Sequence, residues 1–486
     1  MSQTSGFPLS RAGHARALLS LGLPLVGGHV AQFAVGATDT LMLGWYGVPE
    51  LAAGVLGSTY FFVFFILGAG FAWAVMPMVA AESGSGEDPT QIRRVTRMGL
   101  WLSTLYAAIA MPVMIWSEPL LRALGQDPDT AVMAAHYLGI AGWALFPALA
   151  TMVLRSYLAA LERTQVVLWA TVAGAAVNAL GNWVLIFGRF GLPEMGVRGA
   201  ALSSVLVQVV MFGVLIVYAL RVFPQHTLLA RIWRPDWQAF GAVFRLGWPI
   251  GLTNVAEVGM FSASAVMVGW LGAVPLAAHG IALQVATAGF MVHMGLSNAA
   301  TIRAGNALGR KDVFGLRRGA GVAIVMSLAF ACATIVVLVA MPEALVELFL
   351  APDEPARAQI VALGVVLIFL AAAFQVVDGA QVVVVGLLRG VQDTRVPMVI
   401  AGVSYLGIGL PSGYVAGFVL GWGAPGVWVG LIVGLACAAL FLSRRFWGRV
   451  LASLVRQVES GARLPQGALG QAPLPASGPE TPRTIL

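Results

Sequence analysis

Three carboxylates lie inside apolar stretches that are long enough to cross a lipid bilayer. They are Asp39, Glu257 and Asp378, and the other 18 of the 21 acidic residues fall in predicted loops, at helix ends or near the C-terminus. A charged side chain at the bilayer centre costs about 2.5–3.5 kcal/mol on insertion scales, so a chain that keeps one usually needs it. These residues favour a proton or cation site, and a structural hydrogen-bonding role is the alternative.

Two amides could complete such a site. Asn178 and Asn182 are four residues apart, which places them on one face of a helix. They could hydrogen-bond Asp39 or offer carbonyl oxygens to a hard cation, or they could bridge packed helices. Apolar surroundings favour a neutral carboxyl group, and two carboxylates close together share protons or a cation. Such a site is charged when empty and neutral when loaded, which suits a coupling ion.

Sequence motifs for nucleotide binding and for nucleophilic catalysis are absent. There is no GxxxxGK[ST] loop and no nucleophile constellation, which argues against an enzyme and against an ATP-driven pump. His29, His279 and His293 lie in apolar stretches without metal-ligand spacing, so packing roles are expected. Cys332 and Cys437 are also expected to pack. The sequence therefore predicts no cofactor other than a coupling ion.

The composition is that of a polytopic membrane protein. The chain is 59% hydrophobic and only 10% charged, whereas soluble proteins carry about 25% charged residues. Twelve apolar runs of spanning length predict an all-α fold. They cover about 17–43, 51–81, 98–117, 131–154, 165–188, 199–220, 243–271, 276–302, 319–341, 358–388, 396–421 and 424–443.

The basic residues predict the orientation of these helices. With both termini in the cytoplasm, 24 of the 28 Lys and Arg residues fall in cytoplasmic segments, and only Arg122, Arg189, Arg198 and Arg357 fall outside. This asymmetry follows the positive-inside rule. No Lys or Arg is expected near mid-membrane, so a central cavity would be net negative. Such a cavity favours cationic substrates over anionic glycans or phosphates, which would need Arg clamps.

The first half of the chain is repeated in the second. Shifted by 225 positions, LGLP at Leu21–Pro24 aligns with LGWP at Leu246–Pro249, and 16 of the 64 residues from 21 to 84 are identical. Chance would give about a third of that number. Each half holds six predicted helices, so the halves are parallel repeats about an axis along the membrane normal. The predicted divisions are an N-terminal segment 1–16, a first bundle 17–220, a linker 221–242, a second bundle 243–449 and a disordered cytoplasmic tail 450–486.

The repeat also relates the candidate residues to one another. Glu257 aligns with Gln32, so the two halves carry their carboxylates at different places. Pro24 and Pro249 occupy matching positions in the first helix of each half. Proline kinks a helix, so these helices could bend when their carboxylates change charge; a fixed kink is equally compatible with the sequence.

The sequence resembles the multidrug and toxic compound extrusion (MATE) family and, within it, the bacterial NorM-type branch. The likeness covers about 15–450 and rests on GATDTLMLGWYG with Asp39, NALGNW with Asn178 and Asn182, NVAEVGMFSASAVMVG with Glu257, and VVDGAQVVVVGLLRGVQDT with Asp378. The resemblance implies two six-helix bundles and an antiporter that expels cationic amphiphilic drugs in exchange for Na⁺ or H⁺. It assigns Glu257 and Asp378 to a cation site in the second bundle, where Na⁺ could bind, and the other three residues to one in the first.

One position departs from the family pattern. Phe374 stands one turn before Asp378, where the family often has a tyrosine, so a Na⁺ site there would lose an oxygen. The choice between Na⁺ and H⁺ therefore stays open. The side chains expected to line the substrate cavity are Gln32, Gln284, His293 and Phe374.

The sequence thus predicts a secondary antiporter that works by alternating access between two bundles. It is expected to be a monomer that spans the bacterial inner membrane many times and has no nucleic-acid partner. One alternative is a lipid-linked oligosaccharide flippase of the same superfamily, for which extra helices and basic cavity residues are expected. Another is an ion channel, which would show uncoupled currents.

Overall fold

The computed structural model describes residues 10–86 and 88–459 of the chain. Within these residues, twelve helical segments are long and apolar enough to cross a membrane. Each overlaps one of the twelve predicted stretches. The predicted all-α fold with twelve spans is therefore confirmed.

The helices fall into two bundles. The first contains α1 (Arg11–Tyr46), α2 (Val48–Ser85), α3 (Pro89–Ile115), α4 (Ser117–Ala123), α5 (Pro128–Ala141), α6 (Leu145–Ala160), α7 (Thr164–Ile186) and α8 (Gly196–Val222). The second contains α9 (Trp237–Gly269), α10 (Ala273–Gly309), α11 (Val313–Ala340), α12 (Pro342–Glu347), α13 (Arg357–Gly390), α14 (Arg395–Gly402), α15 (Leu410–Tyr414), α16 (Ala424–Arg445) and α17 (Leu451–Glu459). Two π-helical segments, Val403–Gly409 and Val415–Val419, make α14 and α15 parts of one span.

Aspartates begin several helices at one end of the molecule. Asp88 accepts a hydrogen bond of 2.8 Å from the N–H of Thr90 at the start of α3. Asp312 accepts one of 2.7 Å from the N–H of Gly315 at the start of α11. Such a carboxylate satisfies an N–H group that has no partner in the first helical turn. A charged cap needs water, so these residues mark helix ends that lie outside the hydrocarbon core of the membrane.

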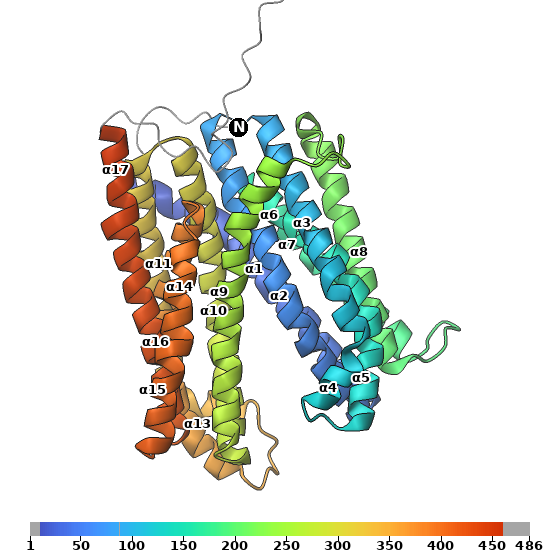
Figure 1. Cartoon of the computed structure of the whole chain (residues 1–486). Coiled ribbons are helices and arrows are strands. Elements are labelled where there is room, and N and C mark those ends of the chain that lie inside the picture. Colours follow the sequence, from blue (N-terminus) through green and yellow to red (C-terminus); the bar gives the residue numbers. More distant parts are fainter. Residues whose placement is uncertain (1–9, 87, 460–486) are drawn as a thin grey trace, which may run out of the picture.

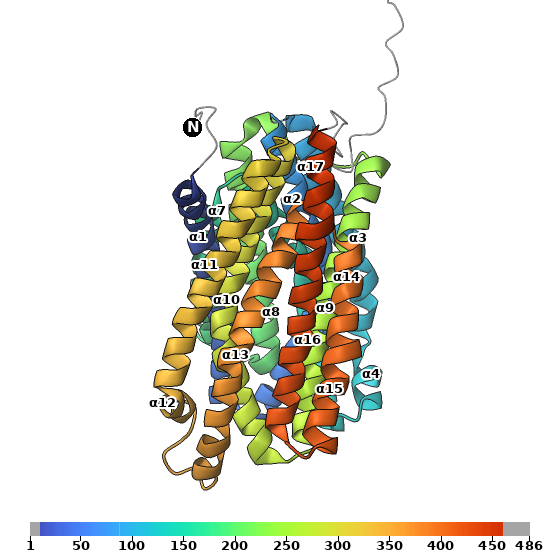
Figure 2. The same cartoon turned by 90° about the vertical axis from the view of Figure 1, so that its left-hand side faces the viewer.

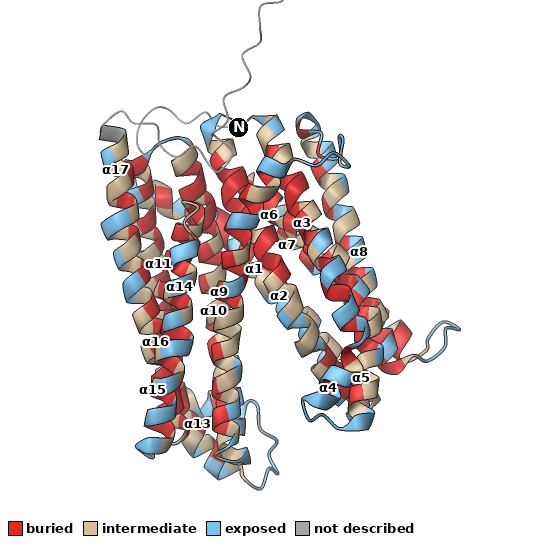
Figure 3. Cartoon of the chain, in the orientation of Figure 1, coloured by how far each residue is buried: buried red, intermediate tan, exposed pale blue. Residues whose placement is uncertain are grey.

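The two bundles meet at the end where α1 begins and diverge toward the other end (Figure 1). Buried residues are concentrated where the bundles meet (Figure 3). Turned by 90°, the second bundle shows α11, α13, α16 and α14 running side by side along the molecule (Figure 2). The twelve spans thus form two arms that are joined at one end.

Glycines allow the bundles to approach so closely. A Cβ atom on Gly70 of α2 would lie 2.6 Å from the carbonyl oxygen of Gly247 in α9. A Cβ atom on Gly295 of α10 would lie 2.8 Å from the backbone nitrogen of Val26 in α1. Each crossing therefore joins the second helix of one bundle to the first helix of the other. Small residues at a crossing let helix backbones pack directly, which is how helices in membranes gain van der Waals contact.

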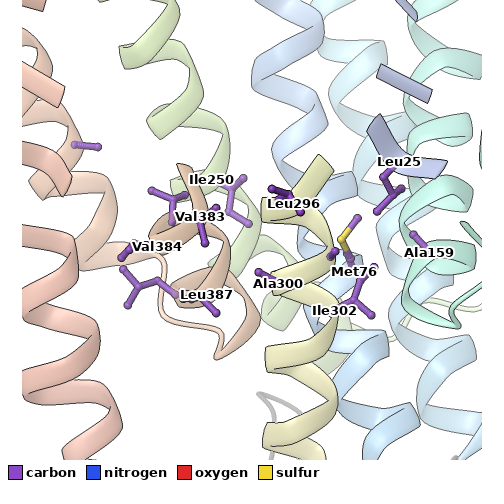
Figure 4. Packing of buried hydrophobic residues seen from close by; sticks show 14 of the residues in the cluster. Leu25, Met76, Ala159, Ile250, Leu296, Ala300, Ile302, Val383, Val384 and Leu387 are labelled. Atoms are coloured by element: carbon purple, nitrogen blue, oxygen red, sulfur yellow. The ribbon is translucent and has the colours of Figure 1, made fainter. Parts of the chain in front are cut away.

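A buried apolar layer fills the junction between the bundles. Figure 4 shows α10 between two groups of side chains, with the first bundle on one side and α13 with α9 on the other. Its labelled members are Leu25, Met76, Ala159, Ile250, Leu296, Ala300, Ile302, Val383, Val384 and Leu387, all of them buried. The layer closes the space between the bundles at this end.

The segment between the bundles packs on the first one. Arg97 Nη1 donates to the carbonyl of Arg231 at 3.1 Å, and Trp101 Nε1 donates to the carbonyl of Ile232 at 2.7 Å. Arg94 binds Asp236, the N-cap of α9, with two nitrogens, one of them 3.1 Å from Asp236 Oδ1. Burial alone would raise the pKa of the Asp236 carboxyl, but the hydrogen bonds from Arg94 and from the Ala239 N–H outweigh it and hold that pKa below its usual value.

The C-terminal segment departs from the prediction. The sequence predicts a disordered tail from residue 450, but the last span continues as α17, Leu451–Glu459. Leu451 and Leu454 are each only 5% exposed, so packing of one apolar face holds this helix. The remainder of the predicted tail, 460–486, lies outside the described residues.

Candidate functional site

A cavity of about 610 Å³ lies between the bundles. Helices α1, α2, α6, α7 and α8 line it from one side, and α9, α10 and α13 line it from the other. Six phenylalanines contribute to its apolar wall: Phe61, Phe62, Phe65, Phe261, Phe290 and Phe374. Leu25, Met76 and Ala159 belong both to its lining and to the apolar layer of Figure 4, so that layer forms its floor. This volume suits a drug-sized molecule.

Glu257 of α9 and Asp378 of α13 both line this cavity. Phe261 and Phe374, one turn from each carboxylate, pack edge to face with ring centroids 6.0 Å apart, which joins the two helices at this level. Asp378 is 1% exposed. Both of its oxygens and Glu257 Oε1 are buried without a hydrogen-bond partner among the described residues. Buried carboxylate oxygens without donors are costly, so they are available to a proton or a cation.

Residues that sequence reasoning missed surround this pair. Arg389 Nη2 of α13 donates to Asn254 Oδ1 at 2.8 Å, one turn before Glu257 on α9. The hydroxyl of Tyr405, which is fully buried, accepts a hydrogen bond of 2.6 Å from Gln381 Nε2. Arg389 lies within electrostatic range of Glu257, and Tyr405 lies within range of both carboxylates. From the sequence alone, an arginine near a helix end is expected to lie on the cytoplasmic side. Nothing in the sequence indicates that the side chain of Arg389 points toward Glu257 instead.

Asp39 has a different environment. Its Oδ1 accepts hydrogen bonds from Asn178 Nδ2 at 2.9 Å and from Asn182 Nδ2 at 2.5 Å. Both asparagines, on α7, are fully buried, and Asn182 Oδ1 has no partner among the described residues. None of the three lines the cavity between the bundles. The structure thus brings this trio together inside the first bundle, apart from Glu257 and Asp378.

A basic side chain lines the cavity, contrary to expectation. Arg155 of α6 is part of the wall, and its Nη1 lies 3.4 Å from Gln32 Oε1 on α1. It is the only Lys or Arg that lines this cavity among the residues the structure describes. The expectation of a cavity without basic side chains is therefore wrong. Counted along α6, Arg155 is close to the helix end, but its side chain turns into the space between the bundles.

Two of the predicted cavity residues lie elsewhere. Gln32 and Phe374 do line the cavity, but Gln284 is exposed and is not part of its wall. His293 is fully buried inside the second bundle, where its Nδ1 lies 2.8 Å from Ser327 Oγ. Both predictions fail for the same reason, because hydropathy does not reveal which face of an apolar helix looks into the cavity. Pro24 and Pro249 lie inside α1 and α9, as predicted.

Two histidines take part in contacts between helices. His29 Nε2 of α1 lies 3.1 Å from Asn298 Nδ2 of α10, which joins the two bundles beside the cavity. Trp428 Nε1 donates to His279 Nδ1 at 3.0 Å within the second bundle. No group of three or more His, Cys, Asp or Glu side chains within 10–86 and 88–459 could hold a metal ion.

Comparison with known proteins gives a family model and relatives that agree with one another. The family model MatE matches residues 24–184 and 249–415. The chain is 44% identical over 436 residues to a probable multidrug resistance protein NorM of Rhizobium meliloti (strain 1021), a match that covers 89% of this chain and 93% of that protein. It is 36% identical over 448 residues to a multidrug resistance protein NorM of Burkholderia vietnamiensis, with 92% and 96% covered.

Solved structures with low sequence identity share the fold. The crystal structure of the eukaryotic MATE transporter AtDTX14 superposes with a TM-score of 0.81 at 18% identity, covering 93% of this chain and 99% of that chain. The outward-facing conformation of a multidrug resistance MATE family transporter of the MOP superfamily gives a TM-score of 0.79 at 20% identity, with 93% and 99% covered. The arrangement of twelve helices in two six-helix bundles is thus shared with transporters of known structure.

Proposed function

Because the chain belongs to the MatE family, as its sequence motifs indicate, we propose that it is a secondary active antiporter. It exports cationic amphiphilic drugs and toxic organic compounds in exchange for Na⁺ or H⁺. The observation that carries this proposal is the pair Glu257 and Asp378, which line a cavity between the two bundles and have three carboxylate oxygens buried without hydrogen-bond donors among the described residues.

Competition for these carboxylates couples the two fluxes. A bound proton or Na⁺ neutralises the carboxylates and lowers their attraction for a cationic substrate, and an emptied site regains that attraction. The aromatic lining supports this class of substrate, because organic cations bind the faces of aromatic rings. A polyspecific cavity needs apolar and aromatic surface with few fixed polar groups, which is what the lining offers.

Alternating access would use the two bundles as units, 17–220 and 243–449, joined by the linker 221–242. The floor of the cavity lies at the end that carries most of the basic residues. By the positive-inside rule this end faces the cytoplasm, so we assign the conformation as outward-open and both termini to the cytoplasmic side of the inner membrane. Pro24 and Pro249 interrupt the hydrogen bonding of α1 and α9, and a bend there would accompany the change of state.

The trio Asp39, Asn178 and Asn182 is the candidate for a second ion site, in the first bundle. Its support is the pair of hydrogen bonds from the two amides to Asp39 and the free Oδ1 of Asn182. Carboxylate and amide oxygens together suit a hard cation. Phe374 offers no oxygen to a Na⁺ in the second bundle, but Tyr405 brings a hydroxyl near both carboxylates, so the coupling ion is decided by experiment.

The test is efflux of an aromatic cation from proteoliposomes with an imposed Na⁺ or pH gradient, one at a time. Glu257→Gln and Asp378→Asn are expected to abolish gradient-driven transport while the proteins insert and remain folded. Glu343→Gln and Asp353→Asn, which change exposed carboxylates, are the matched controls and should transport normally. Normal transport in both cavity variants would refute the assignment.

The same vesicles separate the rival functions. An ion channel would pass current without substrate, and a lipid-linked oligosaccharide flippase would move such a lipid and ignore the cation. The twelve spans of the described residues include no extra helices of the kind expected for a flippase.

A further inference from the structure

Arg155 is a partly buried cation in the cavity wall without a protein counter-charge. It forms no ion pair with a carboxylate among the described residues, whose ion pairs involve other arginines. Its one polar contact is the uncharged Gln32 Oε1, at 3.4 Å. Partial removal of a charge from water without a partner is unfavourable, so a chain that keeps one in a cavity wall has a use for it.

The internal repeat shows what Arg155 lacks. A shift of 225 residues relates His29 and Gln32 of α1 to Asn254 and Glu257 of α9. In the second bundle, Arg389 of the fourth span donates to Asn254 and lies within electrostatic range of Glu257. In the first bundle, Arg155 of the fourth span faces His29 and Gln32. Both bundles therefore place an arginine beside the same two positions of their first helix, but only the second supplies a carboxylate.

We propose that Arg155 is an anion-binding subsite of the cavity and that it takes the carboxylate of amphiphilic substrates that also carry a cationic group. This inference rests on the proposed export function and extends its substrate class from cations to zwitterions. A guanidinium binds a carboxylate through two parallel N–H donors, which gives both affinity and orientation. Gln32 occupies the position of Glu257 in the repeat, so the ligand supplies the carboxylate that the first bundle omits.

The cavity has room and polarity for such a ligand. Its first-bundle wall carries Arg155, and its second-bundle wall carries Glu257 and Asp378. No ion pair joins Arg155 to Glu257 or Asp378, so the two charged regions are separate within one space of about 610 Å³. A substrate with its cation and its carboxylate at opposite ends of an aromatic body matches this arrangement.

The experiment compares two probes that differ in a single charge. One is an aromatic amphiphile with a quaternary ammonium at one end and a carboxylate at the other, and the second is its methyl ester. Binding of each is measured by calorimetry to the full-length protein in detergent. The proteins are wild type, Arg155→Gln, Gln32→Glu and the control Arg221→Gln, which changes an exposed arginine at the end of α8.

Arg155→Gln is expected to weaken binding of the carboxylate probe by at least about tenfold, the effect of losing a charge-assisted hydrogen bond. Gln32→Glu should do the same, because it supplies an internal carboxylate that occupies the guanidinium. Binding of the ester should stay within about twofold in both variants, and Arg221→Gln should bind both probes as wild type does. The ester thus reports folding of each variant.

Equal weakening for both probes in Arg155→Gln would show a purely structural role and overturn the proposal, and so would unchanged binding of the carboxylate probe. If Arg155→Gln does not fold, the Gln32→Glu comparison decides alone by the same criteria. Gradient-driven efflux of the ester from proteoliposomes tests the proposed export function separately. If the wild type exports the ester but Arg155→Gln affects binding of both probes equally, the result would support the export function and refute only the anion subsite.

Discussion

Gly70 of α2 packs directly against the backbone of Gly247 in α9, and this contact recurs at the equivalent positions of the repeat. A shift of 225 residues converts Gly70 into Gly295 and Gly247 into Gly22. A Cβ on Gly247 would lie 3.1 Å from the carbonyl oxygen of Gly70, and a Cβ on Gly22 would lie 3.8 Å from that of Gly295. The two bundles are thus joined by a pair of symmetry-related crossings, which are the natural places for one bundle to move against the other.

Gly70→Ala is expected to destabilise the observed conformation, because its Cβ would meet the backbone of α9. Overpacking of this kind typically costs about 1–3 kcal/mol. The readout is the thermal unfolding temperature in detergent. Gly213→Ala is the control, since a Cβ at Gly213 meets nothing within 4 Å and gains helix propensity. An unfolding temperature for Gly70→Ala equal to or above that of wild type would show that α2 and α9 can move apart at this crossing without loss of stability.

Removal of one amide beside Asp39 should leave its carboxylate with too few donors. Asn182→Ala is expected to lower the free energy of unfolding by about 1–3 kcal/mol. The same substitution in an Asp39→Asn background should cost less, because the charged acceptor is already gone. A double-mutant cycle measures this coupling, and an additive pair would mean that the 2.5 Å hydrogen bond contributes nothing specific.

Arg389→Gln should destabilise the second bundle, because it removes the donor to Asn254 and the positive charge near Glu257. We expect a loss of about 2–3 kcal/mol in unfolding free energy. The double variant Glu257→Gln/Arg389→Gln should lose less than the sum of the single effects, since it removes both charges together. Denaturant titrations in a mild detergent give all three values, and strict additivity would argue against electrostatic contact.

The Arg94–Asp236 pair predicts a loss of stability in acid. The pKa of Asp236 is lowered in the folded state, so its contribution is complete above the unfolded value of about 4 and disappears as the pH falls through the lower folded value. Asp236→Asn should therefore destabilise by about 1–2 kcal/mol at pH 6. That difference should shrink below about pH 4.

Asp353→Asn, which alters an exposed carboxylate, is the control for this pH series. Its stability should follow that of wild type at each pH. A difference between wild type and Asp236→Asn that stays constant down to pH 2 would contradict the assigned direction.

The sequence by itself determined the spans, the repeat and the intramembrane carboxylates. Membrane helices are long apolar runs whose backbone hydrogen bonds close within the segment, so twelve of them could be found without knowledge of their neighbours. The charge asymmetry and the 225-residue shift are also properties of the linear chain. The cost of burying Asp39, Glu257 and Asp378 singled them out before any contact was known.

Tertiary structure alone decided which side chains face the cavity. These helices are apolar on most faces, so their rotation about their own axes is set by packing against helices far away in the sequence. For that reason Gln284 and His293 lie outside the cavity wall that the sequence predicts for them, and Arg155, which the sequence places near a cytoplasmic helix end, lines the cavity. The separate surroundings of Arg155 and Arg389, one facing Gln32 and the other near Glu257, emerge only when the fourth span of each bundle lies against the first.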